Sequence, residues 1–284
     1  MITDSFDVKT EAIITPEDYY GPQKHICDIC IITFSRVIFQ EVMERYECRK
    51  EGEIGSCAGN IPIYSFEINR GKLSESKASD VKTATGKKSE GRNIEAQTLD
   101  EDTEPLRIGI LLCSIGSVAA GTNITESNWL IGATKFILFG SAGSLDNDKT
   151  KGKYTVPDKA YRDEGMSYHY VPPADYIDVP GCQKVSEIFD EVGIPYVKGG
   201  CWTTDSFYRE TRGLMEKRKS EGCLAVDMEV SGAQAVCDFY GFSLYCFLET
   251  GDVLDEHVYD AAGLFDANHD LNKFFVALEI AKRI

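Results

Sequence analysis

The strongest structural signal in this chain is a series of continuous apolar runs, each ending in glycine, serine or an acid. Four of them are DICIITF (28–34), LRIGILLCSIG (106–116), KFILFGSAGSL (135–145) and FSLYCFLETGD (242–252). A strand that is apolar at successive positions is buried on both faces, as in parallel sheets covered by helices. Segments with helical periodicity alternate with these strands. We therefore predict an α/β fold with a central mixed, mostly parallel sheet flanked by helices on both faces.

Residues 72–106 differ in composition from the sequence around them. The stretch before Leu106 has no aromatic residue and few aliphatic ones, so it cannot bury enough apolar surface to order itself. We interpret it as a mobile surface insertion. Residues 1–27 form a polar, proline-containing N-terminal arm. A single domain is then expected over 28–284, which is long enough to enclose one large core.

Charge and composition exclude several classes of protein. The 284 residues carry a formal net charge of −16, and the Lys and Arg residues are scattered, which argues against a nucleic-acid groove. The chain opens on a polar, acidic stretch with no signal peptide, and no apolar run approaches the roughly 20 residues of a membrane span. Most of the ten cysteines lie in apolar runs, which is typical of free thiols. We expect a cytoplasmic protein without disulfides or membrane partners.

Metal and nucleotide-triphosphate motifs are missing from the sequence. Cys27 and Cys30 form a CxxC pair, but no second cysteine pair stands at metal-binding spacing. The four histidines follow no HExxH or similar pattern, and no GxSxG elbow, GxGxxG or P-loop occurs. We therefore predict neither a metal site nor an organic cofactor.

Functional groups are concentrated where the predicted strands end. In a parallel sheet, ligands bind at the carboxyl ends of strands. The residues delivered there are Thr33, Ser35 and Arg36, then Ser114 to Ser117, then Gly140 to Gly143, then Thr203 to Tyr208, then Asp227 to Glu229, and finally Thr250 to Asp252. Two glycine–serine loops, two carboxylates and an aromatic pair are thus expected to converge.

Each of these features has a structural as well as a functional interpretation. The Gly140–Gly143 loop is either a tight turn or a cradle of backbone N–H groups for an oxyanion or hydroxyl. Phe207 and Tyr208 are either core aromatics or a stacking surface for a flat heterocycle. Asp252 either caps a turn or acts as a general acid. The residues alone leave these alternatives open.

Four segments together give the chain a resemblance to the nucleoside phosphorylase family, which includes purine nucleoside and uridine phosphorylases and the methylthioadenosine/S-adenosylhomocysteine nucleosidases. They are FGSAGSL (139–145), YRDEGMSYHY (161–170), WTTDSFYRETR (202–212) and VDMEVSG (226–232). Asp252 lies 23 residues beyond Glu229, a spacing that suits the family's catalytic aspartate. The resemblance covers about residues 28–283 apart from the insertion. It implies a phosphorylase/hydrolase-like single domain and a homo-oligomer, either a dimer or a hexamer.

The resemblance also implies a role for individual residues. Glu229 would bind the ribose hydroxyls, with Met228 packed on the sugar, and Asp252 would protonate the departing base. Phe207 would stack on the base, beside Tyr208, and Arg209 or Arg212 would reach a base carbonyl. The Gly140 amide and the Ser141 hydroxyl, with Arg36, would hold phosphate or the attacking water. Asp227 stands where the family often has glutamate and is interpreted as a structural acid.

Three departures bear on the nucleophile. Phosphorolytic members usually carry an arginine where Leu138 stands, and another near the position of Phe265. Losing such bidentate contacts weakens a phosphate site. The nucleosidase branch activates water with a glutamate just after the first strand, where Arg36, Val37 and Ile38 stand here. No clear signature of either nucleophile is therefore present.

We expect a pentosyltransferase of nucleoside salvage that cleaves a purine or pyrimidine nucleoside with phosphate as co-substrate, because the 162–165 and 202–205 segments resemble the phosphorylase branch more closely. Hydrolysis with water is the second interpretation. The third is a catalytically weakened nucleoside-binding protein, which the missing arginines favour and the intact Glu229 and Asp252 disfavour.

Overall fold

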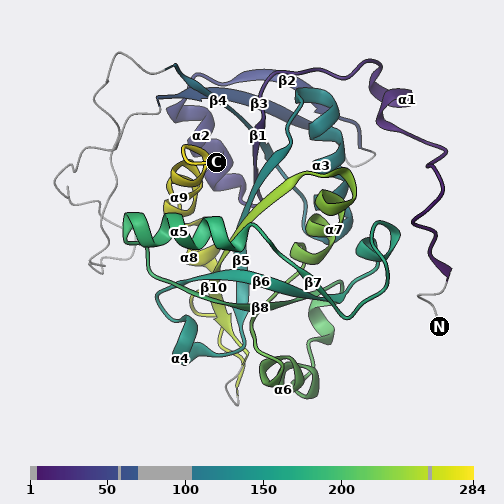
Figure 1. Cartoon of the computed structure of the whole chain (residues 1–284). Helices are drawn as coiled ribbons and strands as arrows, with labels where there is room; N and C mark the ends of the chain where they lie inside the picture. The colour runs from purple at the N-terminus through teal and green to yellow at the C-terminus, as the bar shows by residue number, and fades with distance from the viewer. Residues whose placement is uncertain (1–4, 57–58, 70–103, 255–257) are drawn as a thin grey trace.

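The computed structural model describes residues 5–56, 59–69, 104–254 and 258–284. One ten-stranded sheet organises them (Figure 1). Its strands are β1 (Ile29–Thr33), β2 (Arg49–Ile54), β3 (Ile61–Ile68), β4 (Leu106–Leu112), β5 (Lys135–Ser144), β6 (Tyr154–Asp163), β7 (Tyr176–Asp178), β8 (Tyr196–Thr204), β9 (Cys223–Asp227) and β10 (Ser243–Val253). The predicted mobile insertion falls almost entirely on residues 70–103, outside the described ranges.

The strand directions are mixed, as predicted, and antiparallel pairings are as numerous as parallel ones. Among the described strands, five pairings are parallel and five are antiparallel. The order β10-β6-β8-β9-β5, with a further pairing of β10 to β5, closes these five strands into a barrel. Apolar runs mark a strand as buried without giving its direction, which explains why the antiparallel pairs escaped the sequence analysis.

Helices pack on both faces of β1, whose five residues are all buried. Cys30 and Ile32 belong to the core that includes α3 (Ser117–Ile131) and α7 (Val230–Tyr240). Ile29 and Ile31 belong to the opposite core, with α2 (Arg36–Arg45), α5 (Cys182–Val192) and α9 (Asn272–Ala281). These two groups of helices lie on opposite sides of the sheet in Figure 1. The alternation of side chains along β1 thus supplies two hydrophobic cores.

Shorter elements connect or border this framework. They are α1 (Pro16–Tyr20), α4 (Asn147–Thr150), η2 (Met166–His169), η3 (Phe207–Arg209), α6 (Arg212–Ser220) and α8 (Leu264–His269). The N-terminal arm lies against α3, where the Tyr20 hydroxyl donates to Glu126 at 2.7 Å and the Trp129 indole donates to the Gly21 carbonyl at 2.6 Å. No helix within the described residues is long and apolar enough to cross a bilayer.

Candidate active site

Gly143 brings the two predicted acidic segments together. In the sheet register it pairs with Asp252 of β10 on one side and with Val226, the residue before Asp227, on the other. A β-carbon built on Gly143 would lie 2.4 Å from a Leu254 methyl group, 2.8 Å from a Val226 methyl group and 3.5 Å from Asp252 Oδ2. Only glycine fits between these strands, so this residue of the Gly-Ser-Ala-Gly loop has a steric role beside Asp252.

Asp252 is a buried carboxyl with one hydrogen-bond donor from a neighbouring loop. Its side chain is 4% exposed, and the Tyr259 hydroxyl donates to its Oδ2 at 2.9 Å. Burial raises the pKa of Asp252 above its usual range, and the hydrogen bond from Tyr259 opposes that shift. A carboxyl with a raised pKa retains its proton at higher pH, which suits a general acid.

Asp227 holds the start of α7. It accepts hydrogen bonds from the Thr203 hydroxyl at 2.7 Å and from the backbone N–H groups of Glu229 and Val230 at 2.8 and 2.7 Å. These donors occupy both carboxylate oxygens. Burial raises the pKa of Asp227, and the hydrogen bonds from these donors oppose that shift. The interpretation of Asp227 as a structural acid agrees with these contacts, because its oxygens are committed to the protein.

Glu229 follows Asp227 and is also buried, at 8% exposure. Its Oε1 accepts the Gly116 N–H at 2.7 Å. The glycine turn that follows β4 therefore contacts this acid directly. Met228 is half-buried, and its carbonyl accepts the Ser117 hydroxyl at 2.9 Å. Burial, and then the neighbouring Asp227 carboxylate, raises the pKa of Glu229 to about 8. Of the two acids, Asp227 has the donors that stabilise its charge, so Glu229 takes up the proton.

An aromatic cavity of about 360 Å³ is lined in part by Tyr259, the residue whose hydroxyl donates to Asp252. Phe207 and Tyr208 line it in an edge-to-face pair with ring centroids 5.0 Å apart, and Leu254, Met215, Arg212 and Tyr259 complete the wall with Glu210. Phe207 is 43% exposed and Tyr208 is 93% exposed, so neither is a core aromatic. Arg209 is exposed and does not line the cavity, whereas Arg212 does. The size of the cavity is within the range of small-molecule sites.

Glu210 is a cavity residue that the sequence analysis missed. Burial, and then the carboxylates of Asp252 and Asp227, raises its pKa to about 7. The carboxyl groups of Glu210, Asp252 and Asp227 are therefore close enough to affect one another. In sequence, Glu210 stands among the charged residues around α6, so no pattern distinguished it from a surface acid.

Serine hydroxyls mark the other half of the site. Ser141 is half-buried in β5 and Ser35 is buried at the start of α2, where its Oγ accepts the Ile38 N–H at 3.2 Å. Gly140 lies beside them, with the Phe34 ring against it. Arg36 is exposed, and Leu138, at the position where an arginine is expected, is fully buried in β5. The predicted loops thus meet, but Arg36 is the only arginine at this edge within the described ranges.

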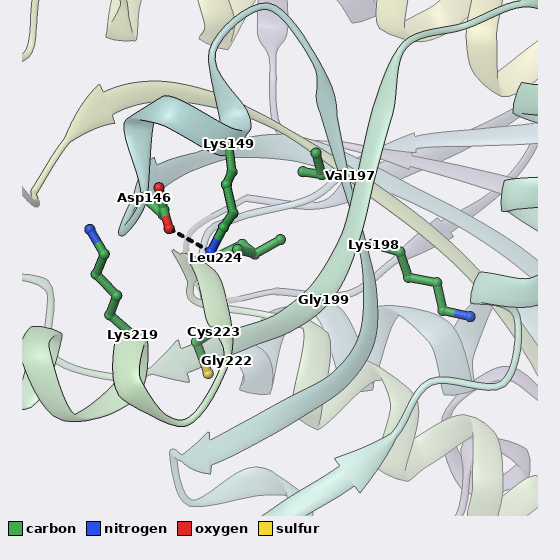
Figure 2. A pocket seen from close by; sticks show the side chains of 9 residues that line it. All are labelled: Asp146, Lys149, Val197, Lys198, Gly199, Lys219, Gly222, Cys223 and Leu224. Atoms are coloured by element: carbon green, nitrogen blue, oxygen red, sulfur yellow. Dashed lines mark ion pairs between the residues drawn. The ribbon is translucent and has the colours of Figure 1, made fainter.

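A second cavity, of about 400 Å³, lies at the opposite end of β9 from Asp227. Figure 2 shows the Lys149 side chain directed at Asp146, with which it forms a 2.8 Å ion pair, while the Lys198 side chain points away from that pair. Its walls carry lysines and apolar groups around one acid that is already paired. The predicted carboxylates Glu229 and Asp252 do not line this cavity, and neither do the aromatic residues Phe207 and Tyr208. Across the described ranges, no three His, Cys, Asp or Glu residues are grouped to hold a metal ion.

Solved structures share this fold. The chain is similar to futalosine hydrolase of Helicobacter pylori strain 26695, with a TM-score of 0.63, 16% identity, and coverage of 91% of this chain and 99% of that one. It is also similar to AMP nucleosidase from Bacteroides thetaiotaomicron, with a TM-score of 0.58, 17% identity, and coverage of 90% and 87%. At such identities the likeness shows the fold alone.

Curated relatives match over a shorter stretch. An uncharacterised protein of Acanthamoeba polyphaga mimivirus is 25% identical over 149 residues, which is 51% of this chain and 57% of that protein. A DeoD-type purine nucleoside phosphorylase of Bacillus cereus is 23% identical over 149 residues, which is 51% of this chain and 63% of that enzyme. The matched region thus spans about three-fifths of the length of these relatives.

The family match is broader than either of these pairwise similarities. The family model described as the phosphorylase superfamily matches residues 69–276, which is more than half of the chain. The matched region includes Gly143, Glu229 and Asp252, around which the site is arranged. The chain belongs to the phosphorylase superfamily.

Proposed function

We propose that this protein cleaves the N-glycosidic bond of a nucleoside by hydrolysis. The observation that carries the proposal is the placement of Asp252 and the Asp227–Glu229 segment on either side of Gly143, next to an aromatic cavity. The superfamily as a whole supports nucleoside cleavage, whereas the choice of water as nucleophile depends on the residues at the serine-lined edge.

Bond cleavage needs charge stabilisation at both ends of the breaking bond. As the C1′–N bond breaks, its electron pair moves to the base, and Asp252 gives its proton to the departing nitrogen. The sugar becomes oxocarbenium-like, and the Glu229 carboxylate stabilises that positive charge. Gly116 holds one Glu229 oxygen, and we assign the other to a sugar hydroxyl. Phe207 and Tyr208 provide apolar faces on which a flat base can stack.

Water is favoured as the nucleophile because the expected phosphate-binding arginines are replaced. Leu138 is buried and uncharged, and Phe265 is 72% exposed on α8. Arg36 is an exposed cation on the first turn of α2. Phosphate recognition usually depends on bidentate arginine contacts, and a single exposed arginine contributes little to them. The hydrolase and the nucleosidase that share the fold are compatible with this assignment.

Phosphorolysis is the second candidate. It is favoured by the 23% identity to a purine nucleoside phosphorylase, and Arg36 with Ser141 would then hold the phosphate. A homo-oligomer remains our expectation for either reaction, since Tyr208 is 93% exposed at the mouth of the cavity.

A product assay tests the function. Purified protein is incubated with purine and pyrimidine nucleosides, with and without orthophosphate, and free base, free sugar and sugar phosphate are quantified. We expect free base and free sugar in equal amounts, at a rate that is independent of phosphate. Sugar 1-phosphate would instead establish phosphorolysis. If no nucleoside is cleaved but one raises the melting temperature, the protein is a binding member of the family.

Replacing Tyr259 by Phe tests the assignment of Asp252 as the acid. The Tyr259 hydrogen bond lowers the pKa of Asp252, so its loss should raise that pKa further. Asp252 then stays protonated to higher pH, and the alkaline limb of kcat/KM should move upward by about one pH unit. Tyr208→Phe is the matched control, because Tyr208 lines the same cavity without a hydrogen bond to Asp252 in the described structure. An unchanged limb in Tyr259→Phe would argue against Asp252 as the titrating acid.

A further inference from the structure

The carboxyl end of α8 contacts both serines at the serine-lined edge. Ser35 Oγ lies 2.8 Å from His269 Nδ1, and the Ser141 hydroxyl donates to Asn268 Oδ1. β1 and β5 run parallel with Thr33 opposite Phe139, so Ser35 and Ser141 follow at corresponding positions of neighbouring strands. Two consecutive residues of one short helix therefore hold two hydroxyls that come from different strands.

Tight packing fixes α8 in this place. A β-carbon built on Gly251, the residue before Asp252, would lie 2.7 Å from the Ala267 side chain and 3.0 Å from the Leu264 backbone. The helix thus rests directly on the β10 backbone beside the proposed acid. Any side chain at position 251 would push α8 away, and with it Asn268 and His269.

A partly buried ion pair anchors the same end of α8. Lys273 is 1% exposed, its ammonium group donates to the Ala267 carbonyl, and it lies 3.0 Å from Glu249 Oε2. Glu249 is directly opposite Ser141 in the β10–β5 register. A pair of this kind adds little to stability, because desolvation offsets its Coulomb energy. The Lys273 ammonium contacts the carbonyl that immediately precedes Asn268, so the pair holds the end of α8 that carries Asn268 and His269.

The hydrogen-bond directions indicate what Ser141 can offer to a nucleophile. A hydroxyl has one proton and two lone pairs. Ser141 gives its proton to Asn268, so it presents lone pairs to the site. Lone pairs accept a hydrogen bond from water, whereas a phosphate oxygen needs a donor. Ser35 already accepts the Ile38 N–H, which leaves its proton for His269 Nδ1 when the imidazole carries its own proton on Nε2.

We propose that Asn268 and His269 are positioning residues that orient Ser141 and Ser35 to hold the attacking water. This inference rests on the proposed function. The water oxygen forms a bond to C1′ as the C1′–N bond breaks, and Asp252 protonates the base. The proton that the water loses passes to Ser35 Oγ, which gives its own proton to His269 Nδ1. Asn268 and His269 thereby select water over phosphate.

Substitutions on α8 test this proposal in the full-length protein. His269→Leu and Asn268→Leu remove the polar contacts, and His269→Asn restores an amide near the Nδ1 position. Asp266→Asn, an exposed acid on the same helix, is the control. Each variant is assayed for kcat and KM, and for the ratio of methyl glycoside to free sugar formed when methanol competes with water. Circular dichroism and melting temperature verify folding.

Both leucine variants should lower kcat by about 10- to 100-fold while KM changes by less than about threefold, because the nucleophile loses its position and the nucleoside keeps its contacts. Their methyl glycoside fraction should rise severalfold. His269→Asn should restore the wild-type product ratio, because its amide oxygen can still accept the Ser35 hydroxyl, but it should not restore kcat, because an amide cannot take up the proton that the water loses. A purely structural role would lower the folded fraction without changing that ratio.

Three results would overturn the inference. The first is leucine variants that retain wild-type kcat and product ratio, and the second is a loss that only follows the folded fraction. In both of these cases, hydrolysis of the nucleoside by the wild type would still support the proposed function. The third is phosphate-dependent release of sugar phosphate by the wild type, which keeps nucleoside cleavage but removes water as the nucleophile. A wild type that cleaves no nucleoside would instead reject the proposed function together with this inference.

Discussion

Asp252→Asn should lower kcat for nucleoside cleavage by about 10³-fold, since an amide cannot protonate the departing base. The amide can still accept the Tyr259 hydrogen bond, and its size matches that of the carboxyl, so folding and binding should survive. The steady-state rate is measured with the best nucleoside from the product assay. Binding is measured as the rise in melting temperature with added nucleoside, which should match that of the wild type.

The control for this substitution is Asp238→Asn. Asp238 is an exposed acid of α7 that accepts one side-chain hydrogen bond, from Gln234 at 2.7 Å, and partial desolvation of its carboxyl raises its pKa in the same direction as that of Asp252. The control variant should retain the wild-type rate. If Asp252→Asn keeps more than about a tenth of that rate, leaving-group protonation by Asp252 is refuted.

The sequence predicted this half of the site because strand ends are readable from local patterns. VDMEVSG and LETGD each combine a buried strand with an acid at its end, and the spacing between them resembled that of a known family. The structure places both segments beside Gly143. Fold class was predicted for the same reason, since alternating buried strands and helices imply layered α/β packing.

Long-range features were not predictable from the sequence in this way. The closure of β10 onto β6 and β5 depends on pairings between strands far apart in the chain, which no local pattern encodes. The short helix α8 carries no strong periodicity, so His269 was visible only as a histidine without metal-binding spacing. Tyr259 lies in a loop, and its contact with Asp252 exists only after the chain folds.

Glu229→Gln should lower kcat by about 10²-fold and, at alkaline pH, make the protein more stable. The amide oxygen can still accept the Gly116 N–H, but the variant lacks the negative charge that stabilises an oxocarbenium-like sugar. Because the pKa of Glu229 in the free protein is about 8, its ionisation should set the limb of the wild-type kcat/KM profile that rises with pH, and Glu229→Gln should lack that limb.

The effect on stability follows from the direction of the shift in the pKa of Glu229. Folding raises it from 4.5 to about 8, so the folded protein holds a proton that the unfolded chain releases. The resulting stability is fully present below pH 4.5 and is lost as pH rises through 8. Glutamine carries no such charge. The free energy of unfolding of Glu229→Gln should therefore exceed that of the wild type by on the order of 3 kcal/mol at pH 9, and differ little at pH 5.

Glu126→Gln is the matched control for charge removal, because burial also raises the pKa of Glu126, which contacts Tyr20 of the N-terminal arm. It should keep full activity. Urea denaturation at pH 5 and pH 9 measures the stabilities, and initial rates across the same range measure the activity. If Glu229→Gln is no more stable than the wild type at pH 9, folding does not raise the pKa of the Glu229 carboxyl. If it is also fully active, Glu229 does not hold the sugar, and the site requires another acid to carry the positive charge of the transition state.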